Sequence, residues 1–173
     1  EESAATIIRH VQDGVQLARK HRLPPRLQDF IREHHGTLMT RYQYAQALKA
    51  AGNDPSAVDE SEFRYPGPRP QSRETAILML ADGVEARARA ELPQDEEALS
   101  ALIHKVIEFC LAEGQLDDTT LTMRDLTTIA ESFTTTLRNT YHPRIKYPEV
   151  KPAETVQADN QVLVNVSPET EAE

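Results

Sequence analysis

The sequence is short and acidic. Its 173 residues have the length of one domain, and 28 Asp and Glu against 19 Lys and Arg give a formal net charge of −9, so non-specific binding to the phosphates of DNA is not expected. Cys110 is the one cysteine, which excludes an internal disulfide and a thiolate zinc cluster and suits a reducing, cytoplasmic compartment. The longest apolar run, Ala76–Ala81, has six residues, whereas a membrane-spanning helix needs about 20. We therefore expect a soluble segment.

The first third of the chain predicts three helices. Residues 3–20 form an amphipathic pattern in which apolar side chains recur at helical spacing, namely Ile7, Ile8, Val11, Val15 and Ala18. Pro24 and Pro25 suit the first turn of a second helix, which should end near the pair His34-His35 with Gly36 as a left-handed cap. A third helix is predicted over residues 37–51.

Helical periodicity disappears between Asn53 and Ser72, where four prolines and a glycine break the pattern. A loop of about 20 residues is long for a compact domain and is usually functional or disordered. The aromatic residues Phe63 and Tyr65 indicate that this loop packs against the helices. Ser72 is a suitable N-cap for the helix that follows, which should run to about Glu91.

Two more helices are predicted, one from Pro93 to Gly114 and one from about Thr122. The total of about six, with no alternating strand pattern, predicts an all-α fold built as a helical bundle. We assign residues 1–149 to one domain. Residues 150–173 form an acidic tail with few large apolar groups, since residues 151–173 carry five acids and one Lys, and this tail is expected to be disordered.

Histidines and one aspartate are the candidate metal ligands. His10, His34 and His35 could reach one centre if the chain turns at Gly36, and Asp82 interrupts an apolar helix that we expect to be deeply packed. Nitrogen and oxygen ligands without thiolate suit iron, manganese or zinc. The structural alternatives are a solvated helix end for the histidine pair, a core position for His10, and an ion pair between Asp82 and a nearby arginine.

Several segments together resemble one known family. They are His10-Val-Gln-Asp-Gly14, Glu33-His-His-Gly-Thr37, Phe63-Arg-Tyr-Pro-Gly-Pro-Arg-Pro-Gln-Ser72 with Glu74, Met79-Leu-Ala-Asp82 with Val84-Glu-Ala86, and Arg144-Ile-Lys-Tyr-Pro-Glu149. In this order they are similar to the cytoplasmic HD domain of the PgpH-type seven-transmembrane HD-hydrolase receptors, which are cyclic-di-AMP phosphodiesterases. The resemblance covers about residues 1–149, and it implies a cytoplasmic domain of a membrane protein.

The resemblance implies a site with two divalent ions, most plausibly iron or manganese, that hydrolyses cyclic di-AMP to the linear dinucleotide through metal-activated hydroxide. His10, His34 and His35 resemble the three histidine ligands of one ion, and Asp82 resembles the closing ligand of the other. The family also uses an adjacent His-Asp pair, and this sequence contains no such dipeptide. We therefore expect the N-terminal helices of the domain, and any membrane attachment, to precede Glu1. These residues alone should hold at most one ion well, lack activity, and be unstable or form a homodimer.

Cyclic di-AMP has two phosphodiesters and two adenines, and these groups also need contacts with the protein. The candidates are Gly36 and Thr37, through their amides, and Arg64, Tyr65 and Arg69 in the proline-rich loop. The structural alternative is that this loop only braces the helices. Two other functions stay open: a non-catalytic module that binds a cyclic dinucleotide or a partner in signalling, and a hydrolase of another nucleotide.

Overall fold

The computed structural model describes residues 2–140, apart from the side chain of Asn139. All of them belong to one compact unit. The predicted acidic tail and the segment Arg144–Glu149 lie outside the described residues. Within residues 2–140, no helix has the length and apolar content needed to cross a membrane.

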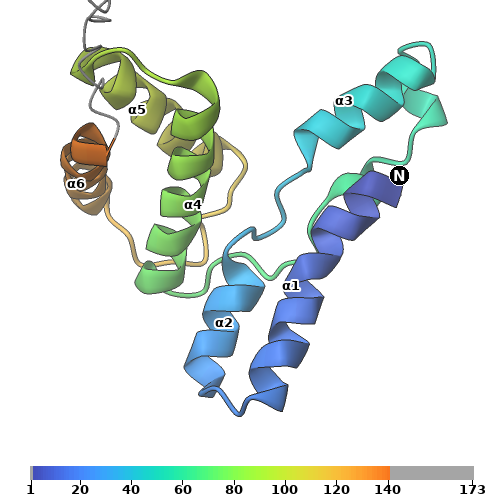
Figure 1. The fold of residues 1–173 in the computed structure, drawn as a ribbon, viewed down its shortest axis with the longest axis horizontal. Helices are drawn as coiled ribbons and strands as arrows, with labels where there is room; N and C mark the ends of the chain where they lie inside the picture. The colour runs from blue at the N-terminus through green and yellow to red at the C-terminus, as the bar shows by residue number, and fades with distance from the viewer. Residues whose placement is uncertain (1, 141–173) are drawn as a thin grey trace, which may run out of the picture. The chain divides into compact units, whose positions relative to one another are not determined.

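The described part of the chain is all-α, as predicted (Figure 1). It contains six α-helices and two short 3-10 helices: α1 Glu2–Lys20, α2 Pro25–Glu33, α3 Arg41–Ala50, η1 Pro55–Ala57, η2 Glu60–Phe63, α4 Arg73–Glu91, α5 Glu96–Ala112 and α6 Met123–Thr140. The described residues also contain one isolated β-bridge, which pairs Met39 with Arg64 in antiparallel orientation. The predicted helix count is therefore confirmed.

Helices α1 and α2 form an antiparallel hairpin (Figure 1). The hairpin packs closely because Gly14 has no side chain: a Cβ there would lie 2.9 Å from Cγ2 of Ile31. The buried residues of α1 are Ala4, Val11, Val15 and Ala18. Ile7, which the apolar pattern of this helix includes, is 36% exposed.

The proline-rich loop packs against the helices, as its aromatic residues predicted. Phe63 is fully buried and Tyr65 is 8% exposed. The loop also explains why α3 begins four residues later than predicted. Residues 37–40 are not helical, and their backbone bonds to the loop: Tyr65 N–H donates to Leu38 O at 2.9 Å, and Thr40 N–H donates to Phe63 O at 2.7 Å.

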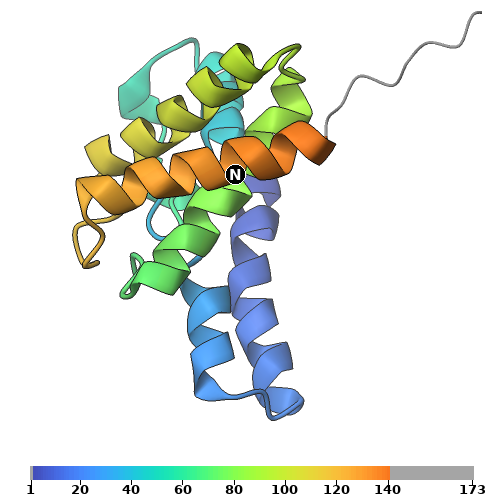
Figure 2. The same ribbon diagram turned by 90° about the vertical axis from the view of Figure 1, so that its left-hand side faces the viewer.

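Helices α4, α5 and α6 enclose the main apolar core, and Figure 2 shows α6 lying along α5. Ser72 caps α4, and its hydroxyl accepts a bond from Thr75 N–H. Asp95, rather than Pro93, is the N-cap of α5, so this helix begins slightly later than predicted. Gly114 has a φ of +64° and follows the end of α5, as expected for a residue that ends a helix.

Candidate metal centre

The structure brings three histidines from two helices together. His10 lies on α1, and His34 and His35 follow the last residue of α2. Each offers one ring nitrogen, and these three atoms lie within 4.8 Å of one another. The rings of His34 and His35 have centroids 4.0 Å apart in the turn that follows α2, and Gly36 continues this turn with a φ of +51°. The predicted convergence of the three histidines is thus present.

Backbone contacts fix which nitrogen of each ring faces the centre. The Nδ1 of His10 contacts the carbonyl oxygen of Ile7, and the Nδ1 of His34 lies 2.8 Å from that of Ile31. A carbonyl only accepts, so we assign the ring protons to Nδ1 in both histidines. The two Nε2 atoms then present lone pairs to each other at 3.2 Å.

A cation bound between the two Nε2 atoms would remove the repulsion between their lone pairs. Nitrogens bound about 2.1 Å from one ion lie about 3.0–3.4 Å from each other at tetrahedral or octahedral angles, and the Nε2 separation of 3.2 Å falls in this range. A metal-bound histidine usually donates its second N–H to a backbone carbonyl or a carboxylate, as His10 and His34 do here. The residues therefore fit a metal ion, and the histidine triad can hold one.

The ring of His35 is partly buried and lies beside the rings of the two other histidines. Burial, and then the neighbouring His34 and His10, lower its pKa to about 3, so its ring is neutral at neutral pH and keeps a lone pair. The ring of Tyr65 stacks on it with a centroid distance of 4.3 Å. Burial, and then Asp82, raise the pKa of Tyr65 to about 12, so Tyr65 stays a neutral phenol that orients His35.

Asp82 faces the histidines from α4. Its Oδ2 lies 3.7 Å from Nδ1 of His35, which is too long for a hydrogen bond. The expected deep burial was wrong: the side chain is 47% exposed. The arginines that could have paired with it bind elsewhere, Arg87 to Glu91 and Arg89 to Glu85. Its carboxylate is therefore accessible to a cation beside the triad.

Two buried polar side chains that were not predicted brace the chain around the histidines: Gln115 holds the turn after His35, and Glu33 ties the end of α2 to the proline-rich loop. Gln115 is 2% exposed, and its Oε1 accepts from the N–H of Thr37 at 3.0 Å. Glu33 is 4% exposed and accepts from Gln71 N–H at 2.9 Å. Gly36 must be a glycine here, since a Cβ would lie 2.3 Å from Oε1 of Gln115.

Most of the predicted substrate donors are already bound within the protein. The amide of Gly36 donates to Glu33 O, and that of Thr37 donates to Gln115. Arg64 pairs with Glu60 and also reaches the carbonyl of Thr37. Arg69 donates to Asp118 and to the carbonyl oxygen of Gly114. These contacts are those of a loop that braces the helices, and a contact of these residues with substrate stays a prediction.

Comparison with known families identifies the fold of this site. The family model described as "HD domain" matches residues 1–87, which include all four candidate ligands. The chain belongs to the HD-domain family. This HD domain is 40% identical over 143 residues to the cyclic-di-AMP phosphodiesterase PgpH of Bacillus subtilis, and 40% identical over 150 residues to an uncharacterized protein of Synechocystis.

A solved structure supports the same relationship. The crystal structure of the HD domain of the phosphodiesterase PgpH from Listeria monocytogenes, in complex with cyclic-di-AMP, superposes with a TM-score of 0.75 at 29% identity. The match covers 84% of this chain and 67% of that one. The alignments take in 83% and 85% of this chain but only 20% and 18% of the Bacillus and Synechocystis proteins. The chain thus spans about a fifth of the length of these relatives.

Proposed function

We propose that this HD domain is part of a metal-dependent phosphodiesterase that hydrolyses cyclic di-AMP to the linear dinucleotide. The observation that carries the proposal is the histidine triad, with its three ring nitrogens within 4.8 Å of one another and Asp82 beside it. The relatives named cyclic-di-AMP phosphodiesterase and the related domain solved with cyclic-di-AMP support the choice of substrate.

In this proposal His10, His34 and His35 hold one divalent ion and Asp82 contributes to a second. When bound there, such ions would polarise a phosphoryl oxygen and make water a nucleophile at neutral pH. Iron or manganese suits the nitrogen and oxygen ligands. The chain itself keeps the ring nitrogens aimed at the centre through the carbonyls of Ile7 and Ile31, and the stacked ring of Tyr65 fixes His35.

A second ion needs more ligands than these residues supply. The resemblance implies a further histidine and a bridging aspartate from an adjacent His-Asp pair, and no His-Asp dipeptide occurs in the 173 residues. We propose that the 173 residues by themselves hold one ion and do not turn over cyclic di-AMP.

The test compares metal content and turnover. We expect the 173-residue chain to bind one manganese ion without turnover, and the full-length protein to bind two and to release linear dinucleotide, measured by elemental analysis and chromatography. His34→Ala should lower metal affinity at least about 100-fold because it removes one of three ligands. His104→Ala is the matched control, since His104 also contacts a backbone carbonyl of its own helix, Ser100 O at 2.8 Å, but belongs to no such triad.

The outcomes separate the proposed enzyme from the alternatives. Binding of cyclic di-AMP by the full-length protein with both ions present but without turnover would instead support a signalling module that only binds the nucleotide. Faster turnover of another nucleotide would keep the metal site and change the substrate. Equal loss of metal in His34→Ala and His104→Ala would remove the triad from the proposal.

A further inference from the structure

The turn between α1 and α2 carries an exposed patch of cations and leucines. Every residue from Arg19 to Leu27 is exposed, and Figures 1 and 2 both show this end of the hairpin pointing away from the other helices. Residues 14–28 contain four cations and no acid, in a chain of net charge −9. We call residues 17–27 the hairpin tip. Nothing in the metal chemistry described above uses it.

Three leucines of the hairpin tip are exposed to solvent. Leu17 is 57% exposed, Leu23 is 39% exposed and Leu27 is 45% exposed. Single exposed apolar side chains are common on protein surfaces, but each of these three lies in the turn or within one helical turn of it. Apolar side chains flanked by cations are typical of segments that rest on a membrane surface without crossing it.

Most of the cations of the hairpin tip have no acidic partner. Arg26 is bound to Glu74 at 3.0 Å. By contrast, Arg19, Lys20 and Arg22 form no ion pair with any residue that the structure describes. Their charges are therefore available to an anionic surface.

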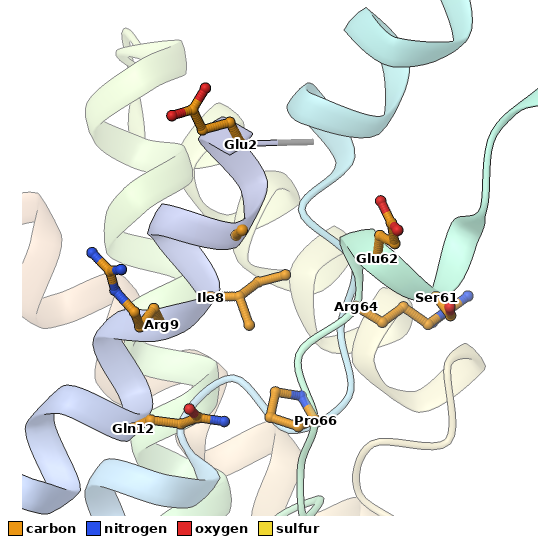
Figure 3. Close-up of a pocket in the computed structure, with 9 residues that line it drawn as sticks. Glu2, Ile8, Arg9, Gln12, Ser61, Glu62, Arg64 and Pro66 are labelled. Carbon is orange, nitrogen blue, oxygen red and sulfur yellow. The ribbon is translucent and has the colours of Figure 1, made fainter.

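The other end of α1 has a different charge pattern. The groove between α1 and η2 has a volume of about 510 Å³ and is lined by two acids, Glu2 and Glu62, as well as two arginines, Arg9 and Arg64 (Figure 3). Both arginines form ion pairs within the chain. The cations of α1 that are not paired therefore lie at the hairpin tip.

The backbone of the hairpin tip holds an arginine where a glycine is usual. Arg22 has a φ of +54°, a left-handed conformation that strains a residue with a side chain. The bonds are those of a Schellman motif, in which glycine commonly takes this position: Leu23 N–H donates to Ala18 O at 2.9 Å, and Arg22 N–H donates to Arg19 O at 3.0 Å. Glycine would make the same turn with less strain, so the arginine adds its charge rather than its backbone conformation.

We propose that the hairpin tip binds the surface of a membrane that contains anionic lipids. Leu17, Leu23 and Leu27 enter the headgroup region, and the cations contact the lipid phosphates. A protein partner matches the tip less well, because lysine is depleted at protein interfaces and leucine is rare among the residues that dominate their energy. Residues 17–27 also contain no Phe, Trp or Tyr. The histidines His34 and His35 follow the opposite end of α2, so the inference does not depend on the metal centre.

Sedimentation of the 173-residue chain with lipid vesicles tests the proposal. We expect binding to vesicles of phosphatidylcholine and phosphatidylglycerol, and at least about tenfold weaker binding to vesicles of phosphatidylcholine alone, since several cations contribute. Binding should weaken as salt is added, because the Debye length falls from about 10 Å at 0.1 M to about 3 Å at 1 M. Equal binding to both kinds of vesicle, or to neither, would overturn the proposal.

Two substitutions test the charges of the tip. Lys20→Gln should weaken binding about fivefold, the effect of one cation near an anionic surface. Lys49→Gln is the matched control, since both lysines are exposed and lie in the last turn of a helix, and it should bind as the wild type does. Arg22→Gly should also weaken binding about fivefold without lowering the midpoint of thermal unfolding, because glycine suits the left-handed φ. Equal binding by the two lysine variants, or loss of binding in Arg22→Gly only together with loss of folding, contradicts the proposal.

A leucine substitution distinguishes a membrane from an acidic protein. Leu17→Gln should weaken binding to anionic vesicles at least about fivefold, because the leucine no longer leaves water. Leu92→Gln is the matched control, since Leu92 is also 57% exposed but lies at the end of α4. If Lys20→Gln weakens binding and Leu17→Gln does not, the tip binds through charge alone, as it would bind an acidic protein, and the membrane proposal is wrong.

Discussion

The hairpin of α1 and α2 and the layer of α4, α5 and α6 are packed in different ways. The hairpin buries small or short apolar side chains on α1, and the buried residue of α2 is the charged Glu33. The layer of α4–α6 buries a continuous apolar cluster with fully enclosed residues such as Leu80 and Ile103. The three histidines lie on the hairpin, and the carboxylate that we propose as a ligand, Asp82, lies on α4.

We therefore expect the two regions to contribute differently to the stability of the domain. Apolar burial is the dominant source of stability in a domain, so the layer of α4–α6 should determine whether the domain folds. The hairpin gains less from burial and is held to the layer by polar contacts such as Gln115 with Thr37. Helices with few buried apolar contacts open most easily, and a metal ion that joins α1 to α2 should oppose that opening.

The largest effect is expected from a cavity in the layer of α4–α6. Ile103 is fully buried, and Ile103→Ala should lower the free energy of unfolding by about 3–4 kcal/mol, because it removes buried methyl groups and leaves a void. Leu111→Ala on the same helix, where Leu111 is 37% exposed, should cost less than about 1 kcal/mol. Urea titration measures both, and similar losses would show that the layer is not the main source of stability.

Gly36→Ala tests the connection between the two regions. The substitution forces a Cβ against Gln115 and Met79 at a φ of +51°, and we expect a loss of about 2–4 kcal/mol from overlap and left-handed strain. Gly52→Ala isolates the strain, because Gly52 has a φ of +70° and open space around it, and should cost about 1 kcal/mol. Thermal unfolding of the two variants compares them. If the two substitutions lower the stability equally, the overlap of the new Cβ with Gln115 adds nothing to the loss.

Metal binding should stabilise the hairpin and leave the layer unchanged. At a manganese concentration 100 times its Kd, opening of the hairpin becomes less favourable by about 2.7 kcal/mol. Hydrogen exchange in peptides from α1 and α2 should then slow by up to about 100-fold, while exchange in α5 and α6 stays the same. The His34→Ala chain should show no such slowing. Equal protection of all helices would mean that the two regions open together.

Local patterns in the sequence predict the helices and the pairing of His34 with His35, because both depend on residues close in the chain, whereas His10 joins them from 24 positions before His34. Apolar spacing defines α1, and Gly36 marks the turn in which His34 and His35 lie side by side. The errors come from contacts between distant segments. The late start of α3 follows from bonds between residues 37–40 and the loop at 63–65, and Gln115 reaches Thr37 from 78 positions along the chain.

The exposure of Asp82 is a different kind of error. The apolar run Ala76–Ala81 shows that α4 is buried on more than one side, but such a run lacks the periodicity that would show which side stays open. Leu78, one turn before Asp82, is itself 38% exposed. The sequence therefore identifies the carboxylate as unusual without showing which face of the helix carries it.

The smallest expected effect is on the ionisation of Cys110, whose buried thiol becomes accessible only when the layer of α4–α6 opens. Burial lowers the pKa of His35 to about 3 and raises that of Cys110 to about 11; in both cases it favours the neutral form. An unfolded thiol ionises near its ordinary value of 9.0, so the stability that Cys110 contributes is complete below pH 9 and declines as pH rises from 9 to 11.

Alkylation measures this difference directly. At pH 8 native Cys110 should react with iodoacetamide far more slowly than the same cysteine in guanidinium, because the native thiol is both 2% exposed and protonated. The native rate should rise with pH until about 11, the pKa of the buried thiol. Manganese should not change it, since the ion binds the hairpin and Cys110 lies in α5. Rapid alkylation of native protein at pH 8 would mean that the layer opens as readily as the hairpin, and the division between the two regions would fail.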